Sequence, residues 1–361
     1  MLERLSDTNK TTIANLTVRV LAAVVSLGLN VCLARELGDS GYGEYVYPLA
    51  YFDVIALIAV MGLDSASIRY VPKYRDSEQG ALLSGLLRAS RILVSLSSVL
   101  AAGVIVLVVL NFNGLGKAGN SLTIAIAAGL LPAFTLMMLS RAQLEGFGRP
   151  VLARGCVELL RPALIGSVVF GALLMDSAHM GPSAAMAVNV LATVVAVVIL
   201  IHFIDATRNS GAGRRRRYQI GEWMRVGVPL LLVASFAKTI ESSGTVILGI
   251  MQGELAAGRY RAATKGASAA SFGLAAASAV VAPKISSLYH QDRLARLQEL
   301  VRKTTKFIAV VTLVAAAVLV ALGRPLLSLF GEGFEQAYPA YVAVVSGHVV
   351  SALGGFGGWF M

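Results

Sequence analysis

Amides and a cation recur on one face of the first long apolar stretch, residues 12–33. At about 100° per residue in a helix, Asn15, Arg19 and Asn30 fall within about 60° of one another. A charge at bilayer depth costs at least about 2.5 kcal/mol, so such a residue usually faces water, a cavity or a partner. We therefore expect this face to line a polar cavity, with Arg19 as its cation.

Two later apolar stretches also carry cations. Lys238 lies within residues 226–250, and Arg261 and Lys265 lie four residues apart, on one helical face, at the start of residues 259–282. Guanidinium and ammonium groups bind phosphate oxygens, the guanidinium through two parallel hydrogen bonds. Together with the arginine of the first stretch, these side chains form a predicted cationic cavity for a diphosphate group.

Ordinary structural roles compete with this interpretation. Lys238 could form a buried ion pair with Glu241, which follows three residues later. Arg261 and Lys265 could extend their charged ends into water at the membrane surface. Asp53 could pair with the arginine of the first stretch or bind a coupling cation. The sequence leaves these alternatives open.

Catalytic and metal chemistry find no support in the residue spacing. The four histidines lie in separate segments, and none has the HExxH or Cys–His spacing of a zinc site or of a nucleophile with its base. The GLGKAG motif at 114–119 lacks the GxxxxGK[ST] spacing of a phosphate-binding loop. We therefore expect no metal, no cofactor and no enzymatic activity.

The elements that must position these residues are membrane-spanning helices. Of 361 residues, 56% are hydrophobic and only 14% charged, with a mean hydropathy of +0.73. A bilayer core needs roughly 20 apolar residues per helix. The fold class that we predict is all-α integral membrane, with about ten transmembrane helices. The expected spans are residues 12–33, 45–63, 92–110, 121–140, 156–175, 183–204, 226–250, 259–282, 305–322 and 338–359.

Basic residues indicate the topology. Most of the 31 Lys and Arg residues fall in the connecting segments that lie inside if the amino terminus is cytoplasmic. A run of arginines, Arg214 to Arg217, lies in the longest polar connection, and the net charge is +11. Such charge could contact nucleic acid, but a cytoplasmic loop beside anionic lipid headgroups attracts basic residues in any case, and we favour that interpretation. We interpret the run as a lipid-facing loop and expect membrane lipids, not nucleic acid, as its partners.

An internal repeat divides the chain. LARELGDSGYGEY, after the first span, aligns with LGIMQGELAAGRY, after the seventh, at one constant offset of 215 residues, as in Gly38 to Gly253. The other aligned pairs are Leu33 with Leu248, Gly43 with Gly258, and Tyr45 with Tyr260.

The repeat predicts three parts. These are an N-terminal lobe of six spans at 1–205, a basic cytoplasmic linker at 206–223 and a C-terminal lobe at 224–361. The second lobe has only four of six expected spans, so we expect an incomplete repeat and a truncated chain.

A family resemblance rests on four motifs taken together. They are the repeat motif, the LEGFGRP turn at 144–150, and the later segments ILGIMQGELAAGRYRAATK and LLSLFGEGFEQAY. The chain resembles the polysaccharide-export flippases of the Wzx type, in the MOP superfamily that also holds multidrug MATE exporters and lipid II flippases. The resemblance implies twelve or fourteen helices in two MATE-like lobes around a cavity that opens alternately to each side.

The resemblance also implies a function: translocation of an undecaprenyl-type diphosphate oligosaccharide across the cytoplasmic (inner) membrane for polysaccharide export. Its partners would be that lipid-linked substrate, membrane lipids and the polysaccharide polymerase or export machinery. The competing hypotheses are a cation-coupled drug antiporter of the MATE type, which an acidic cavity would favour, and a nonfunctional flippase remnant. An integral-membrane glycosyltransferase would need a large outer loop with carboxylates, which the sequence lacks.

Overall fold

The computed structural model describes the backbone of residues 2–111, 121–175, 180–207, 216–268 and 294–353. Within those ranges, the side chains before residue 17 and at 19, 110, 121, 294–305, 307, 308, 352 and 353 lie outside the described part. The chain divides into a larger unit, Val24–Gly258, and a smaller unit made of Met1–Ala23 with Arg259–Met361. Each unit is considered by itself.

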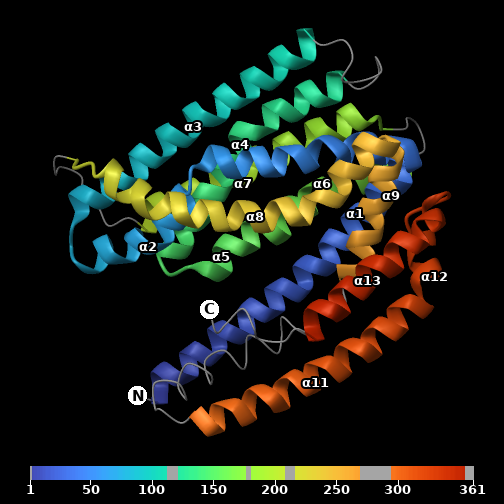
Figure 1. Cartoon of the computed structure of the whole chain (residues 1–361). Helices are drawn as coiled ribbons and strands as arrows, with labels where there is room; N and C mark the ends of the chain where they lie inside the picture. Colours follow the sequence, from blue (N-terminus) through green and yellow to red (C-terminus); the bar gives the residue numbers. More distant parts are fainter. Residues whose placement is uncertain (1, 112–120, 176–179, 208–215, 269–293, 354–361) are drawn as a thin grey trace. The chain divides into compact units, whose positions relative to one another are not determined.

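Every regular element that the structure describes is a helix, as expected (Figure 1). The larger unit contains most of α1 (Leu2–Val60), then α2 (Leu63–Asp76), α3 (Gly80–Asn111), α4 (Ser121–Gly146), α5 (Pro150–Arg154), the π-helix η1 (Gly155–Leu160), α6 (Arg161–Met175), α7 (Pro182–Thr207), α8 (Ile220–Gln252) and the start of α9 (Glu254–Ala267). The smaller unit contains the rest of α9, then α11 (Leu294–Ala321), α12 (Gly323–Ser328), the 3₁₀-helix η3 (Phe334–Ala337) and α13 (Tyr338–Leu353).

Within the described residues, 6 helices are long and apolar enough to cross a membrane. They are Val20–Val60, Gly80–Val109, Leu122–Gly146, Pro150–Met175, Pro182–Thr207 and Ile220–Gln252. The first two expected spans both lie within α1, which consists of two helical segments that meet at a kink at Gly38. Its 41-residue apolar part is about twice the length that one crossing of a bilayer needs. The expected span 259–282 is described only as far as residue 268, and a total of ten spans stays a prediction.

Two glycines that the repeat aligns have the same backbone conformation. Gly38 kinks α1 at φ 69°, ψ 177°, and Gly253 ends α8 at φ 87°, ψ 178°. A positive φ combined with an extended ψ is essentially restricted to glycine, because a Cβ would clash with the backbone. The repeat therefore preserves a specific backbone bend as well as a sequence pattern.

The next aligned pair makes a direct contact. A Cβ on Gly258 would lie 2.7 Å from the Cα of Gly43, and a Cβ on Gly43 would collide with the carbonyl group of Glu254. The backbones of α1 and α9 meet here without any intervening side chain. Lipid tails are as apolar as leucine, so membrane helices associate through such close packing of small residues.

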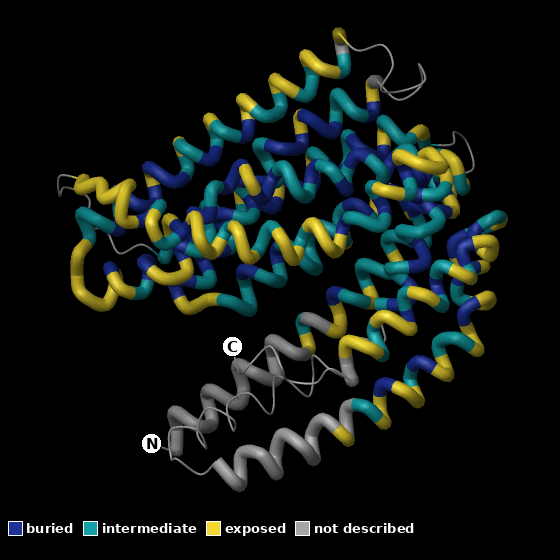
Figure 2. Tube along the Cα trace, in the orientation of Figure 1, coloured by how far each residue is buried: buried dark blue, intermediate teal, exposed yellow. Residues whose placement is uncertain are grey.

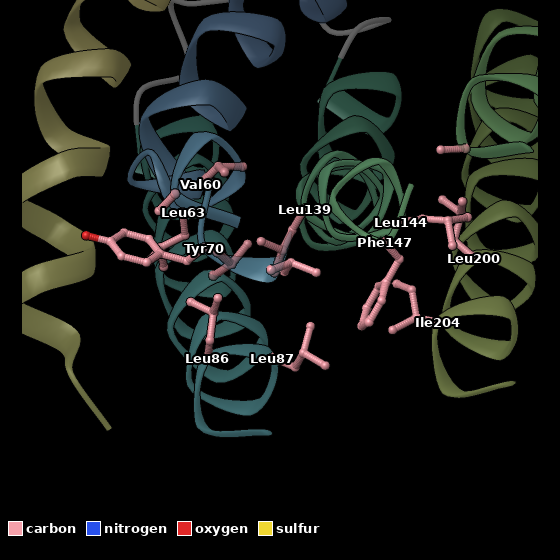
Figure 3. Close-up of a cluster of buried hydrophobic side chains, with 14 of the residues drawn as sticks. Val60, Leu63, Tyr70, Leu86, Leu87, Leu139, Leu144, Phe147, Leu200 and Ile204 are labelled. Atoms are coloured by element: carbon pink, nitrogen blue, oxygen red, sulfur yellow. The ribbon is translucent and has the colours of Figure 1, made fainter. Parts of the chain in front are cut away.

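A buried apolar core holds one end of the larger unit together (Figure 3). It joins α2, α3, α4 and α7, and α2 packs on α3, α4 and α8. Among its members are Val60, Leu63, Tyr70, Leu86, Leu87, Leu139, Leu144, Phe147, Leu200 and Ile204.

Several spans have residues that are exposed in the structure (Figure 2), and many of these are large apolar residues. On α3, Leu100 is 72% exposed, and on α8, Phe236 and Ile240 are 71% and 75% exposed. Exposed large apolar side chains in such number are unfavourable in water and stable in hydrocarbon. The arrangement confirms that the chain is a membrane protein.

In the smaller unit, an apolar cluster joins α9, α11, α12 and α13. The ring of the buried Tyr341 packs close to Gly323, and its hydroxyl donates to the carbonyl oxygen of Leu319 at 3.1 Å. The neighbouring Tyr338 donates in the same way to Val320. These hydroxyls thus bond to carbonyls of α11, which keeps them satisfied in an apolar environment.

A hydrogen-bonded aromatic pair fixes α2 against the start of α8. The indole N–H of the fully buried Trp223 donates to the hydroxyl of Tyr74 at 3.0 Å, and that hydroxyl donates to Oε1 of Gln219 at 3.1 Å. One turn away, the Tyr70 hydroxyl donates to the carboxylate of Glu222. Burial raises the pKa of both tyrosines, so both hydroxyls stay protonated and able to donate.

We predict that Tyr74→Phe lowers the stability of the protein by about 1–3 kcal/mol, because the buried indole N–H of Trp223 loses its acceptor. The measurement is the thermal unfolding temperature of the purified protein in detergent. Tyr218→Phe is the control, since that ring is 52% exposed and should lose little. Equal unfolding temperatures for the two variants would contradict the role of the pair.

Candidate functional site

Polar side chains of the larger unit gather at the middle of its spans. We call them the embedded polar cluster: Tyr45 and Asp53 of α1, Arg161 of α6, Asn189 and Thr193 of α7, and Lys238 of α8. Arg161 lies about 16 Å along its span and Lys238 about 27 Å along its own, at 1.5 Å per residue. Lys238 is thus far from either end of its helix, whereas the part of the helix before Arg161 also carries the charged Arg154 and Glu158.

Arg161 is the centre of the cluster. Its Nε donates to the hydroxyl of Thr193 at 2.9 Å, and its Nη2 donates to Oδ1 of Asn189 at 2.7 Å. The Nδ2 of Asn189 in turn donates to the Tyr45 hydroxyl at 2.8 Å. The guanidinium also lies over the ring of Phe134, 5.4 Å from its centroid. Two fixed hydrogen bonds and one ring therefore hold this cation in place.

The direct hydrogen-bond partners of Arg161 are neutral. Within the part of the chain that the structure describes, no carboxylate lies within ion-pair distance of it, although Asp53 attracts it from further away. Other arginines of the larger unit are paired directly: Arg91 with Asp205, and Arg154 with Glu145. A fixed cation that lacks a direct counter-ion is suited to bind an anion.

The local fold explains how Arg161 reaches this position. The π-helix η1 ends directly before it, and Pro162 follows it. Proline provides no N–H and crowds the carbonyl four residues earlier, which a wider π turn accommodates. The extra residue in that turn rotates the face that follows by about 100°. Arg161 is thereby presented to α7, where a residue count along an ideal α-helix would not place it.

Lys238 binds two carboxylates. Its Nζ lies 3.1 Å from Oδ2 of Asp53 on α1 and 3.2 Å from Oε2 of Glu241 on its own helix. The side chains of Asp53 and Lys238 are 20% and 28% exposed, whereas that of Glu241 is 64% exposed. Asp53 is therefore the principal partner, because charges attract more strongly where less water screens them.

Of the sequence-predicted residues, the structure brings three together, whereas Asn30 bonds to other partners. It brings Lys238, Asp53 and Glu241 together, which joins the predicted local ion pair to an interhelical one. Asn30 donates to the carbonyl of its own helix at Ser26 and accepts a hydrogen bond from the buried Tyr42 at 2.8 Å. These contacts satisfy the amide of Asn30 locally.

The remaining predicted cations stay untested. The side chains of Arg19 and Asn15 lie outside the described residues. Arg261 and Lys265 are half-buried on α9 in the smaller unit, so they are considered apart from the embedded polar cluster.

Sequence reasoning missed Arg161, Asn189 and Thr193. The available signal was an arginine inside the expected span 156–175 and an asparagine inside 183–204. Arg161 follows two other arginines closely and reads as the end of a basic loop. Only the packing of α6 on α7 shows that it faces a partner and not the lipid headgroups.

An apolar pocket of about 260 Å³ lies beside the cluster on another face of α1. It contains no charged side chain, and its two tyrosine hydroxyls, Tyr47 and Tyr51, bond to each other at 2.6 Å. The pocket can accept a hydrocarbon chain but offers nothing to an anion. Its lining is Tyr47, Pro48, Tyr51, Phe52, Ile55, Ile105, Val109 and Ile124.

Metal chemistry finds no site in the residues that the structure describes. They contain no group of three or more His, Cys, Asp or Glu side chains that could hold a metal ion.

Comparison with protein families gives one match. Residues 9–289 match the profile of a family described as polysaccharide biosynthesis protein. No curated protein matches the chain by sequence.

Solved structures share the fold at low sequence identity. An inward-facing multidrug resistance MATE family transporter of the MOP superfamily has a TM-score of 0.73 at 14% identity, over 95% of this chain and 84% of its own. The outward-facing conformation of a MATE transporter of that superfamily has a TM-score of 0.57 at 13% identity, over 95% and 80%. A MOP superfamily transporter from Pyrococcus furiosus, described as having a binding pocket of reverse polarity that suggests a different function, has a TM-score of 0.56 at 14% identity, over 95% and 83%.

Proposed function

The chain belongs to the polysaccharide biosynthesis protein family, and we propose that it moves a lipid-linked oligosaccharide of the undecaprenyl diphosphate type across the cytoplasmic membrane for polysaccharide export. Its family and fold are those of membrane transporters and flippases, not of enzymes. The headgroup would cross through the protein by alternating access of two lobes, while the lipid tail stays in the hydrocarbon. The polysaccharide polymerase or export machinery would receive the product.

The observation that carries this proposal is the state of Arg161. A guanidinium that lies within a candidate span and is held by neutral partners keeps hydrogen-bonding capacity and positive charge for a ligand. A diphosphate offers several anionic oxygens in the geometry that a guanidinium binds best. Lys238 pairs with Asp53 at 3.1 Å, and the charge of Asp53 also acts on Arg161, so we propose that both cations act on one headgroup. Arg19, Arg261 and Lys265 remain candidates for further phosphate contacts along the path.

A cation-coupled drug antiporter is the competing function, and it needs an acidic site. Asp53 is the carboxylate of the embedded polar cluster, and it is occupied by the ammonium group of Lys238 at 3.1 Å. A coupling cation would have to displace that lysine. This pairing favours an anionic substrate over a cationic drug.

We predict that Arg161→Ala reduces translocation at least 100-fold while the protein still inserts into the membrane. Arg161→Lys should keep part of the activity, since the charge remains but the two-pronged donor is lost. The measurement uses proteoliposomes that contain an undecaprenyl diphosphate oligosaccharide, with a membrane-impermeant glycosidase reporting the exposed headgroups. Arg88→Ala, at an exposed arginine of α3, is the control. Full activity of the Arg161→Ala protein would exclude this residue from the site.

Alternating access gives the Gly43–Gly258 contact a role. These glycines are equivalent in the repeat, so we propose that their contact forms between the two lobes and must open and close in each cycle. Gly258→Leu should then block translocation, and Gly258→Ala should slow it, because any Cβ meets the backbone of Gly43.

The control for this second prediction is Gly103→Leu, since a Cβ at Gly103 meets no atom within 4 Å. Both leucine variants add the same side chain to a helix, and translocation in the proteoliposomes compares them. Normal translocation by the Gly258→Leu protein would remove the contact from the transport cycle.

The orientation in the membrane is also a proposal, supported by the distribution of basic residues. After Arg217, between α7 and α8, only a fused reporter that works in the cytoplasm should be active. A reporter fused after Gly116, in the connection between α3 and α4, should be active only on the outer side. Alkaline phosphatase and green fluorescent protein fusions measure the two locations, and the reverse pattern would invert the topology.

A further inference from the structure

The ion pair between Asp53 and Lys238 raises a question that the anion-binding proposal does not answer. A site for a diphosphate needs cations, and a carboxylate inside it repels the ligand. Yet Asp53 lies on α1, 3.1 Å from Lys238 on α8, and also attracts Arg161 on α6. It thus acts on both cations of the embedded polar cluster.

We infer that Asp53 is a built-in competitor for the substrate: its carboxylate holds Lys238 when the site is empty and must release it when a diphosphate binds. This inference rests on the proposed function. It assigns to Asp53 the role of a specificity-determining residue, which sets how tightly the anionic headgroup is held and how readily it leaves.

Three features of the structure support this role. The partners come from different helices, so the pair can separate by a small helix movement without unfolding either helix. Glu241 provides Lys238 with a second carboxylate at 3.2 Å, so the ammonium keeps a counter-ion when Asp53 lets go. The pair is partly exposed, and a partly hydrated pair exchanges partners more easily than a dry one.

Competition between Asp53 and the substrate for Lys238 would help a transporter to release its substrate. Without Asp53, Lys238 would keep only the more exposed Glu241 as its counter-ion, and the cluster would bind a diphosphate more tightly and release it more slowly. A carboxylate that returns to Lys238 as the diphosphate leaves favours dissociation on the far side. Because substrate and Asp53 compete for the same ammonium group, each weakens the hold of the other.

The experiment measures binding of farnesyl diphosphate, a short prenyl diphosphate, to the purified full chain in detergent by isothermal titration calorimetry. Asp53→Asn should bind the probe about tenfold more tightly than the wild-type protein. Lys238→Gln should bind it more weakly. In the Lys238→Gln background, Asp53→Asn should give little further gain, because the competition is for Lys238.

Three controls make the result interpretable. Asp205→Asn makes the same chemical change at a carboxylate that pairs with Arg91 outside the cluster, and it should leave affinity unchanged. Glu241→Gln should tighten binding less than Asp53→Asn, because the Glu241 carboxylate is more exposed. Thermal unfolding temperatures establish that each variant is folded. Glu241 still neutralises Lys238 in Asp53→Asn, so that variant should lose only a few degrees.

Two outcomes would overturn the inference. The first is unchanged or weaker binding by a folded Asp53→Asn protein, which assigns Asp53 a purely structural role. The second is an equal gain in the Lys238→Gln background, which reduces Asp53 to a general source of repulsion. Failure of the proposed function looks different: neither the wild-type protein nor any variant would bind the probe, or Arg161→Ala would bind it as well as the wild type.

Discussion

The cost of placing a charge or an unpaired polar group in hydrocarbon constrains the whole larger unit. Without water at bilayer depth, each donor and acceptor needs a partner inside the protein. The contacts of Arg161 follow from this requirement: α7 contributes both a hydroxyl and an amide, α4 contributes an aromatic ring, and the amide is itself held by Tyr45 of α1. A cation kept at this cost without a direct counter-ion is better explained by a ligand than by stability.

Close backbone contacts solve the complementary problem of holding helices together where the hydrophobic effect is weak. Gly43 against Gly258 joins α1 to α9, and Gly62 against Gly227 brings the start of α2 onto α8, with a Cβ on Gly227 only 2.7 Å from the Gly62 carbonyl oxygen. Dispersion between backbones replaces the burial of large side chains at these points. Such contacts have no side chains to interlock, so they can part and re-form, as alternating access would require.

The glycine contacts and the polar contacts depend on one another. Glycine contacts let the spans approach, and their approach brings Asp53, Arg161 and Lys238 from three helices into one cluster. The cluster in turn contains both the groups that would bind an anion and the carboxylate that would compete with it. Affinity and release are then set by the same few side chains.

The sequence alone determined the environment of the chain and the positions at which to look for function. Composition and the length of the apolar stretches required a helical membrane protein, and the repeat found Gly38 and Gly253 before their shared backbone bend was known. The sequence also indicated Asp53, Lys238 and Glu241 as candidate residues, but it did not show which partners they have. A helical wheel gives the directions of side chains on one helix and says nothing about the neighbouring helices. Arg161 was read as the end of a basic loop, because it closely follows Arg149 and Arg154, and the π turn before it leaves no periodic signal in the sequence. Tertiary structure decided which polar groups meet, for the physical reason that their pairing energy depends on distances between helices.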